Sequence, residues 1–348
     1  MIIKSLKLVN FRNYSLSNFT FDRGINFIYG DNAIGKTNLV EGIYYFSLTR
    51  SFRTNTESLL INKNASSFYL EGVFIKENKK YNINISLASN VKKIGVNGRN
   101  IKKVSDLSKI VNVISFIPSD VNLLKDTPKK RRDFLNTTIL KNNPSYLKLL
   151  NDYEYLIKER NSLLKSESLD FNLINIINFK LASISYEIYK IRDKFINKIR
   201  ESVEALYKEI FNKDINIKVD YLTFNTSSDY VNKCLKIYEE NMDNDLKLGY
   251  TSTGIQKDDF SLKIDGKDIG KFGSQGENRI ASLILKLSIY ELSEINNKPI
   301  LILDDILSEL DKNNESLLLK YLNKVEQVFI TSTKKYDIEN CHYCYLTK

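Results

Sequence analysis

The sequence predicts an α/β protein with a P-loop core sheet, a separate antiparallel β-sheet, and an inserted helical lobe with a short antiparallel helical arm. Three observations predict this class. They are a glycine-rich loop at residues 30–37, an apolar stretch closed by two aspartates at residues 299–305, and a helical pattern from about residue 128 to 211. With 348 residues, the chain is long enough for two lobes with a sizeable core.

The loop at residues 30–37 reads Gly-x-x-x-x-Gly-Lys-Thr, which is the phosphate-binding P-loop pattern. An apolar strand pattern precedes it, and residues 38–46 follow with the spacing of a helix. Backbone N–H groups of such a loop point at a phosphate, and the helix N-terminus adds partial positive charge. We expect Lys36 to reach the β- and γ-phosphates and the Thr37 hydroxyl to ligate Mg²⁺. The predicted nucleotide-binding residues are Gly30, Asp31, Asn32, Ala33, Ile34, Gly35, Lys36, Thr37 and Asn38.

The stretch at residues 299–305 ends a buried strand in Asp304 and Asp305, the Walker B pattern. Parallel strands deliver such side chains to one edge of a sheet, beside the P-loop. We expect Asp304 to hold Mg²⁺ and Asp305 to orient or deprotonate the attacking water, with Lys36 as the second catalytic residue. The implied ligands are ATP and Mg²⁺.

A third motif, Ser274-Gln275-Gly276-Glu277, precedes a strongly apolar helix predicted from Ile280 to about residue 295. It places a small hydroxyl and a glycine at a helix N-terminus, which favours anions.

The remaining β pattern predicts strands at residues 3–8, 16–21 and 25–28, and an antiparallel meander over residues 67–101. Within the meander, Asn97-Gly98 indicates a type I′ hairpin, and Asp265-Gly266 indicates another hairpin later in the chain. Further buried strands are expected at residues 111–117 and 328–331, and residues 215–221 are expected to form a strand.

The helical pattern predicts two long helices, the second from about residue 169 to 211. Their apolar residues recur every three or four positions, so the two helices pack most simply against each other as an arm. Ser228 and Asp229 are expected to cap a further helix that reaches about Leu246.

The formal net charge of +10 favours a polyanionic partner. The candidate DNA-binding residues are Lys129, Lys130, Arg131, Arg132, Lys92 and Lys93. Solvated faces are the alternative for each cluster, and Arg131 or Arg132 could instead support a dimer interface. Since the sequence lacks a base-reading motif, recognition would rest on the DNA backbone or structure.

Several classes are excluded or disfavoured by composition. No apolar run approaches the ~20 residues of a membrane span, and the N-terminus lacks a signal-peptide pattern, so we expect a cytoplasmic protein without membrane contact. Cys341 and Cys344 resemble half of a zinc site, but the other ligands are lacking. His342 is the only histidine, which removes most triad hydrolases and many nucleases.

Together these motifs resemble the ABC-type ATPases, in which a signature loop contacts the γ-phosphate held by the other protomer. Within that superfamily the chain resembles the RecF family of bacterial DNA replication and repair proteins. The segments that carry the resemblance run in order over nearly the whole chain: residues 11–14, 30–38, 51–54, 116–120, 129–135, 254–259, 273–279 and 303–311.

The resemblance implies an ABC-type ATPase head that dimerises head to tail when ATP binds. Each of its composite sites would join one chain's P-loop to Ser274, Gln275, Gly276 and Glu277 of the other. It also implies slow, DNA-stimulated ATP hydrolysis acting as a switch, and binding to single-stranded, duplex or gapped DNA. The implied protein partners are RecR and, indirectly, RecA at gaps.

Three further residues are assigned through the resemblance. Arg12 would stack on the nucleotide base, with an ordinary surface arginine as the alternative. Thr331 stands where transporters carry a switch histidine, and Asp120 would replace a magnesium-binding glutamine that has no obvious counterpart here. The chain departs from the family at Phe52, where members commonly carry a histidine, and at residues 255–257.

We expect three parts: residues 1–118 with the P-loop, residues 119–245 as the helical lobe with its arm, and residues 246–348 with the signature and Walker B motifs. An SMC-type chromosome-organising head and a transporter ATPase subunit are alternatives. The first needs far longer heptad runs between its halves, and the second usually lacks a long helical insert. A P-loop nuclease would need an acidic cluster larger than Asp258 and Asp259.

Overall fold

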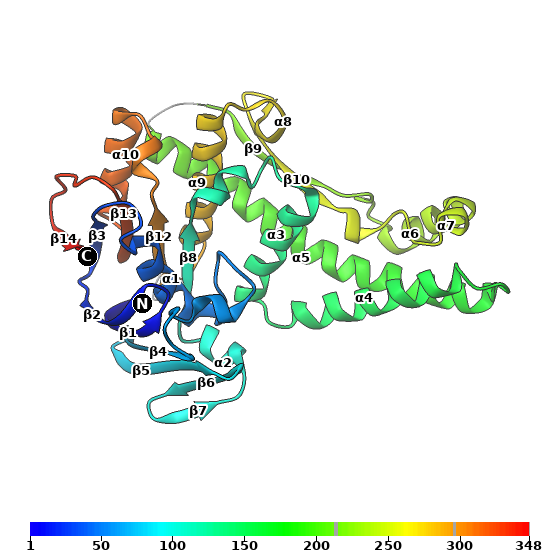
Figure 1. Cartoon of the computed structure of the whole chain (residues 1–348). Coiled ribbons are helices and arrows are strands. Elements are labelled where there is room, and N and C mark those ends of the chain that lie inside the picture. The colour runs from blue at the N-terminus through cyan, green and yellow to red at the C-terminus, as the bar shows by residue number, and fades with distance from the viewer. Residues whose placement is uncertain (212–214, 295–296, 348) are drawn as a thin grey trace. The chain divides into compact units, whose positions relative to one another are not determined.

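The computed structural model describes residues 1–211, 215–294 and 297–347 (Figure 1). The chain divides into two compact units. Unit 1 comprises Met1–Val121, Leu206–Asp214 and Ser282–Lys348, and unit 2 comprises Asn122–Ala205 and Ile215–Ala281.

This division differs from the expected three parts in two places. Leu206–Asp214 belongs to unit 1 and not to the helical unit, and the second boundary lies at Ala281 instead of residue 245. The reason for the second difference is strand pairing. β10 (Asp259–Ile264) pairs antiparallel with β9 (Ile217–Leu222), and β11 (Lys267–Asp268) extends that three-stranded sheet. Backbone hydrogen bonds therefore tie the segment after residue 245 to the helical unit.

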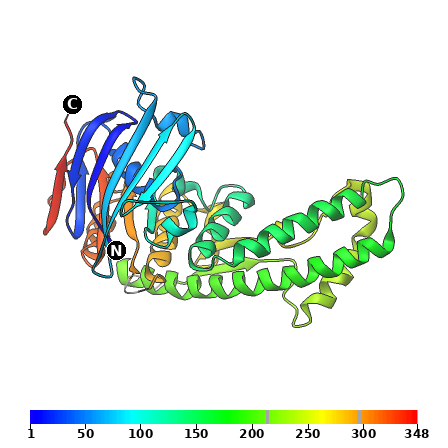
Figure 2. The ribbon, with the colours of Figure 1, turned by 90° about the horizontal axis from the view of Figure 1, so that it is seen from below.

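The core sheet of unit 1 has five parallel strands in the order β14-β3-β13-β12-β8. They are β3 (Gly24–Tyr29), β8 (Val113–Phe116), β12 (Ile300–Asp304), β13 (Gln327–Ser332) and β14 (Cys341–Tyr345). The predicted buried strands are confirmed, whereas the edge strand β14, drawn in red in Figure 2, was not predicted. Because the strands are parallel, the ends of β3, β13 and β12 meet at one edge, where their loops form a site.

The antiparallel sheet of unit 1 has six strands in the order β2-β1-β4-β5-β6-β7. They are β1 (Ile2–Phe11), β2 (Tyr14–Thr20), β4 (Ser67–Lys76), β5 (Lys79–Ala88), β6 (Val91–Val96) and β7 (Arg99–Ile101). The predicted meander is confirmed, and Asn97 and Gly98 both have positive φ, 50° and 79°, as a type I′ hairpin requires.

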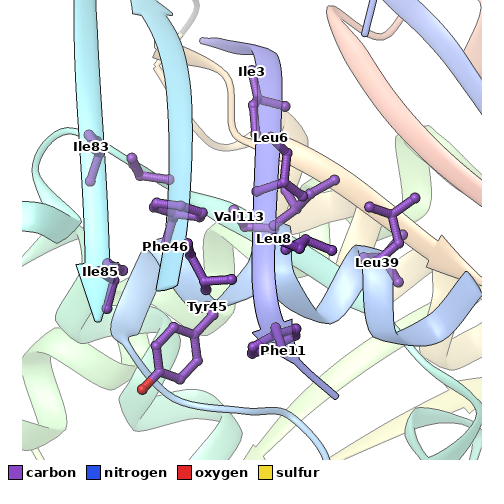
Figure 3. Close-up of a cluster of buried hydrophobic side chains, with 14 of the residues drawn as sticks. Ile3, Leu6, Leu8, Phe11, Leu39, Tyr45, Phe46, Ile83, Ile85 and Val113 are labelled. Atoms are coloured by element: carbon purple, nitrogen blue, oxygen red, sulfur yellow. The ribbon is translucent and has the colours of Figure 1, made fainter. Parts of the chain in front are cut away.

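The main core of unit 1 lies between this sheet and α1 (Lys36–Leu48), the helix that follows the P-loop (Figure 3). Leu6 and Leu8 of β1 and Ile85 of β5 pack into the same cluster as Leu39 and Phe46 of α1. Full burial of such a side chain contributes roughly 1.5–3 kcal/mol. The core thus fixes α1, and with it the P-loop, against the antiparallel sheet.

Unit 2 contains the predicted arm. The helical segment of this unit begins with α3 (Pro128–Asn142), and the arm consists of α4 (Tyr146–Leu163) and the first part of α5 (Phe171–Phe211). Arg160 Nε donates to Asn178 Oδ1 at 2.7 Å, and Arg192 Nε donates to Tyr146 Oη at 2.9 Å. The first contact joins the C-terminal part of α4 to the N-terminal part of α5, and the second joins the start of α4 to a later part of α5. The two helices are therefore antiparallel, as expected.

The single helix expected from Ser228 to Leu246 is wrong. The structure has α6 (Tyr230–Glu240) and α7 (Met242–Leu248), broken at Asn241. The Asn241 side chain donates to the carbonyl of Ile237 at 2.8 Å, and such local bonds compete with helix continuation. Asp229 precedes α6, but its carboxylate accepts from the Asn232 side chain and not from a backbone N–H.

The remaining helices are short, except for α9. They are α2 (Val104–Ser108), α8 (Ile269–Phe272), α9 (Gln275–Glu291), α10 (Lys312–Leu322), η1 (Glu57–Leu60), η2 (Pro118–Asn122), η3 (Ile255–Lys257) and η5 (Leu307–Glu309). α9 begins at Gln275 and not at Ile280 as expected, so the signature motif forms its first turn. Among the helices described, none has the length and apolar character needed to cross a membrane.

Candidate functional site

The P-loop is held in place by the turn between β1 and β2. Asn13 Nδ2 donates to the Ile34 carbonyl at 2.9 Å, and the Tyr14 hydroxyl donates to the Gly35 carbonyl at 3.1 Å. Gly35 has φ of 121°, and a Cβ there would lie 2.7 Å from Asn13 Nδ2 and 2.9 Å from Tyr14 Oη. Only glycine therefore fits at this position of the loop.

The Lys36 ammonium lies against the start of the same loop. Nζ donates to the carbonyls of Gly30 and Asp31, each at 2.7 Å. Burial lowers the pKa of Lys36, while the carboxylates of Asp305, Asp304 and Asp31 act in the opposite direction. A cation placed between the loop and two carboxylates is suited to bind an incoming phosphate oxygen.

Asp304 connects the P-loop helix with the core sheet. The Thr37 hydroxyl lies 3.1 Å from both of its carboxylate oxygens, and the Thr331 hydroxyl donates to Oδ1 at 2.6 Å. Burial raises the pKa of Asp304 above its ordinary value, and the two hydroxyl donors oppose this shift. Thr331 also accepts from the Asp305 N–H at 2.9 Å, so one hydroxyl positions both aspartates.

Asp305 is oriented by its backbone. Its φ is 51°, an uncommon value for a residue other than glycine, and its Oδ1 accepts from the Ser308 hydroxyl at 3.1 Å. Residues of α1, β12 and β13 are therefore brought together at the sheet edge, as the sequence predicted for Lys36, Thr37, Asp304 and Asp305.

The oxygen donors at this edge fit Mg²⁺. Thr37 and Asp304 supply a hydroxyl and a carboxylate, and Mg²⁺ is typically held by one or two carboxylates together with waters and substrate phosphates. Within the part of the chain that the structure describes, no three His, Cys, Asp or Glu side chains form a metal-binding group. A bound Mg²⁺ would neutralise negative charge on the nucleotide phosphates.

Cys341 and Cys344, three residues apart on β14, point to opposite faces of the sheet and cannot share a zinc ion.

A second network lies beside the P-loop helix and centres on Glu41. Arg12 binds its carboxylate in a bidentate manner, at 2.8 and 2.7 Å, and the Ser51 hydroxyl donates to it at 2.5 Å. Glu41 is fully buried and the Arg12 side chain is only 15% exposed, so the surface-arginine alternative is wrong. The guanidinium edge is occupied by Glu41 and the Leu59 carbonyl, which leaves only its faces for stacking.

Glu41 was not predicted as a site residue, whereas its neighbours Arg12 and Asn38 were. Arg53 lies 3.9 Å from the Glu41 carboxylate and donates to Asn38 Oδ1 at 2.8 Å, while Asn38 donates to Asn13 at 2.8 Å. Glu41 therefore joins the segments at residues 11–14 and 51–54. The available signal was a glutamate on the apolar face of the P-loop helix, because a buried carboxylate needs partners.

Asp120 does not join the site as expected. Its Oδ2 accepts from the Ile117 N–H at 2.8 Å and forms an ion pair with Lys286 at 2.5 Å. It lies on η2, which follows β8 at the edge of the core sheet, and its charge is already neutralised there. These contacts disfavour Asp120 as a magnesium ligand.

The signature residues form a capping box at the start of α9 in unit 2. The Glu277 N–H donates to the Ser274 hydroxyl at 3.2 Å, and the Ser274 N–H donates to the Glu277 carboxylate at 2.7 Å. The Ser274 N–H and the Lys267 ammonium lower the pKa of Glu277. Ser274, Gln275 and Gly276 are exposed, and a Cβ at Gly276 would meet nothing within 4 Å. This turn is therefore accessible to another molecule.

Lys92 is not a surface residue available for DNA. Its ammonium contacts the Glu57 carboxylate and the Thr49 carbonyl, and it lies 5.5 Å from the centre of the Tyr45 ring. Strand alternation turns Lys92 toward the core and leaves Lys93 exposed. The prediction for Lys92 is therefore wrong, and that for Lys93 stays a prediction.

The cluster at residues 129–132 divides in the same way. Arg131 binds Asp259 in a bidentate manner at 2.7 and 2.6 Å, and Arg132 donates to the Asp258 carbonyl at 2.9 Å. Both arginines therefore serve unit 2 internally. Lys129 and Lys130 are 79% and 66% exposed, and their described ion pairs are with the nearby Asp133 and Asp126, so they remain candidates for phosphate contact.

The architecture is that of a P-loop ATPase head of the ABC type. Its defining features are the parallel core sheet, the P-loop after β3, the aspartates after β12 and the adjoining antiparallel sheet. The family model described as "RecF/RecN/SMC N terminal domain" matches residues 2–348. The chain is 37% identical over 342 residues to "DNA replication and repair protein RecF" of Clostridioides difficile (strain 630), covering 96% of this chain and 92% of that protein. For the RecF protein of Clostridium kluyveri the identity is 36%, with 97% and 94% covered. The chain belongs to the RecF family.

Solved structures agree with this assignment. The recombination mediator protein RecF-ATP of the RecFOR pathway has a TM-score of 0.83 and 33% identity, covering 97% of this chain and 93% of that one. The Smc head domain from Pyrococcus furiosus has a TM-score of 0.58 and 16% identity, covering 95% and 89%, and shows the shared fold. The predicted fold class and family are confirmed.

The glycine at position 35 gives a direct test of the loop geometry. Gly35→Ala is expected to weaken binding of a fluorescent ATP analogue at least about tenfold, because φ and the contacts with Asn13 and Tyr14 exclude a Cβ. Equilibrium titration measures the affinity. Gly266→Ala is the matched control, since its φ is also positive, 79°, but a Cβ there would meet nothing within 4 Å, and it should bind the analogue normally. Equal affinities for the two variants would contradict the proposed loop constraint.

Proposed function

We propose that the protein is an ATP-dependent DNA-binding protein of recombinational repair and replication-gap processing. In this proposal, ATP joins two copies head to tail, and the exposed Ser274 and Gly276 of each copy close the P-loop site of the other. The observation that carries it is the exposure of Ser274, Gln275 and Gly276 at the signature turn, where the Ser274 side chain bonds within its capping box. A helix N-terminus that presents free N–H groups favours a phosphate.

Hydrolysis is assigned to residues at the sheet edge. Asp305 is held in place by Thr331 and Ser308, and it either orients the attacking water or accepts a proton from it. Lys36 stabilises the negative charge on the phosphates. Thr331 takes the place of a switch residue because it contacts both aspartates. We expect turnover to be slow and stimulated by DNA, so that it releases the dimer as a switch.

DNA as the partner is supported by the relatives and by charge. The relatives are named for DNA replication and repair, one solved relative is placed in the RecFOR pathway, and the chain carries a net charge of +10. As the family resemblance implies, the proposal extends to RecR as a direct partner, RecA as an indirect one, and action in the cytoplasm. Thr331 in place of a histidine and the helical insert disfavour a transporter subunit.

Dimerisation can be tested with two variants of opposite effect. Asp305→Asn should slow hydrolysis about 100-fold or more and leave a stable ATP-bound dimer, because the group that handles the water is lost. Ser274→Arg should remain monomeric at saturating ATP yet bind the nucleotide with normal affinity. Light scattering gives the mass of each. A monomeric Asp305→Asn variant, or a dimeric Ser274→Arg variant, would count against composite sites.

DNA contact can be tested through its salt dependence. Changing Lys129 and Lys130 together to alanine should reduce the slope of log affinity against log salt by about 2, since each phosphate contact releases counterions. Lys190→Ala is the control, because Lys190 is an exposed, paired lysine of the same unit. Fluorescence anisotropy with labelled duplex DNA gives the slopes. An unchanged slope would exclude Lys129 and Lys130, and a flat response of the unaltered chain would contradict backbone recognition.

A further inference from the structure

Four aromatic rings line one face of β3 and β14. Phe27 and Tyr29 lie two positions apart on β3 and therefore share one face of the sheet. The register places Tyr343 beside Phe27 and Tyr345 beside Tyr29. The Tyr29 and Tyr345 rings are 5.0 Å apart and tilted by 31°, and the Tyr29 and Tyr343 rings are 6.1 Å apart and perpendicular. We call these four rings the tyrosine ladder. None of them has a role in the nucleotide site described above.

The ladder is buried at one end and open at the other. Phe27 is fully buried, Tyr29 is half-buried, and Tyr345 is 61% exposed. Tyr345 belongs to β14, the edge strand drawn in red in Figure 2. The middle of the ladder is rigid, because the Tyr343 hydroxyl donates to the Tyr336 carbonyl and accepts from the Ile338 N–H, both at 2.8 Å. Tyr345 packs with one side against the Tyr29 ring and presents the rest of its ring to solvent.

A cation accompanies the rings. Lys335 Nζ lies 4.9 Å from the centre of the Tyr343 ring, and the neighbouring Lys334 is exposed. Two acidic residues, Asp337 and Glu339, follow in the same loop and are exposed as well. Aromatic rings on a sheet with an adjacent lysine are the groups that bind single-stranded nucleic acid, because bases stack on the rings and the cation attracts the phosphates.

The ladder is continuous with the nucleotide site. Tyr29 immediately precedes Gly30, and the Leu346 N–H donates to the Tyr29 carbonyl at 2.9 Å. A Cβ at Gly30 would lie 2.5 Å from the Leu346 carbonyl oxygen, so β14 packs directly against the start of the P-loop. A ligand on Tyr345 would therefore contact an element that borders the bound nucleotide.

We propose that the open face of Tyr345, supported by Tyr29, stacks an unpaired base of single-stranded nucleic acid, with Lys335 attracting the adjoining phosphate. Such stacking is independent of base identity. The inference rests on the proposed DNA-binding function and specifies one of its contact sites.

The absence of tryptophan from the chain makes this directly observable. Tyr345→Trp introduces a single tryptophan whose fluorescence should be quenched when an oligothymidylate of about 20 nucleotides binds, since a stacked base quenches indole. Tyr155→Trp on α4 is the matched control, because Tyr155 is also 61% exposed, and its emission should not change. In parallel, Tyr345→Ala should weaken binding of the labelled oligonucleotide about 5-fold or more, and Tyr345→Phe less than about twofold.

Each other outcome overturns the inference in a distinguishable way. Quenching of the position-345 tryptophan by an ATP analogue alone would assign the ladder to the base of the P-loop nucleotide. Quenching that depends on protein concentration without DNA would assign it to a second copy of the chain. Oligonucleotide binding by anisotropy without quenching would refute the ladder but leave the proposed function standing. A chain that binds no DNA by either readout would refute both.

Discussion

The buried carboxylate of Asp304 is the group on which the site depends. A buried carboxylate is strongly unfavourable without hydrogen-bond donors, and here two threonine hydroxyls from α1 and β13 supply them at 3.1 and 2.6 Å. These donors are available only because β13 lies between β3 and β12 in the core sheet. The strand order, the position of the P-loop helix and the orientation of both aspartates are therefore one coupled arrangement.

Features with a local cause were predictable from the sequence. The P-loop, the apolar strands and the Asn97-Gly98 hairpin follow from glycine positions, period and turn chemistry, and the structure contains all three. Features set by distant pairs were not predictable. Arg131 meets Asp259 across 128 positions, and Lys92 meets Glu57 across 35, so two predicted DNA-binding residues belong to internal ion pairs. Glu41 was missed because its roles depend on segments that only the fold brings together.

The functional groups are divided between the two compact units. The P-loop, the two aspartates Asp304 and Asp305, and Thr331 lie in unit 1. The signature turn lies in unit 2, at the first residues of α9. The same helix continues to Lys286, which holds Asp120 at the end of β8. α9 therefore begins in unit 2 and continues into unit 1.

The most direct test of the central claim mixes two variants that are each inactive alone. Lys36→Ala disables the P-loop of one chain, and Gly276→Asp places a carboxylate at the signature turn of the other. In a head-to-tail pair both defects fall in one site, and the second site is intact. The account predicts that mixing restores ATP hydrolysis to about a quarter of the unaltered rate, since half of randomly formed pairs are mixed and each holds one of two sites. Mixtures as inactive as the separate variants would contradict it.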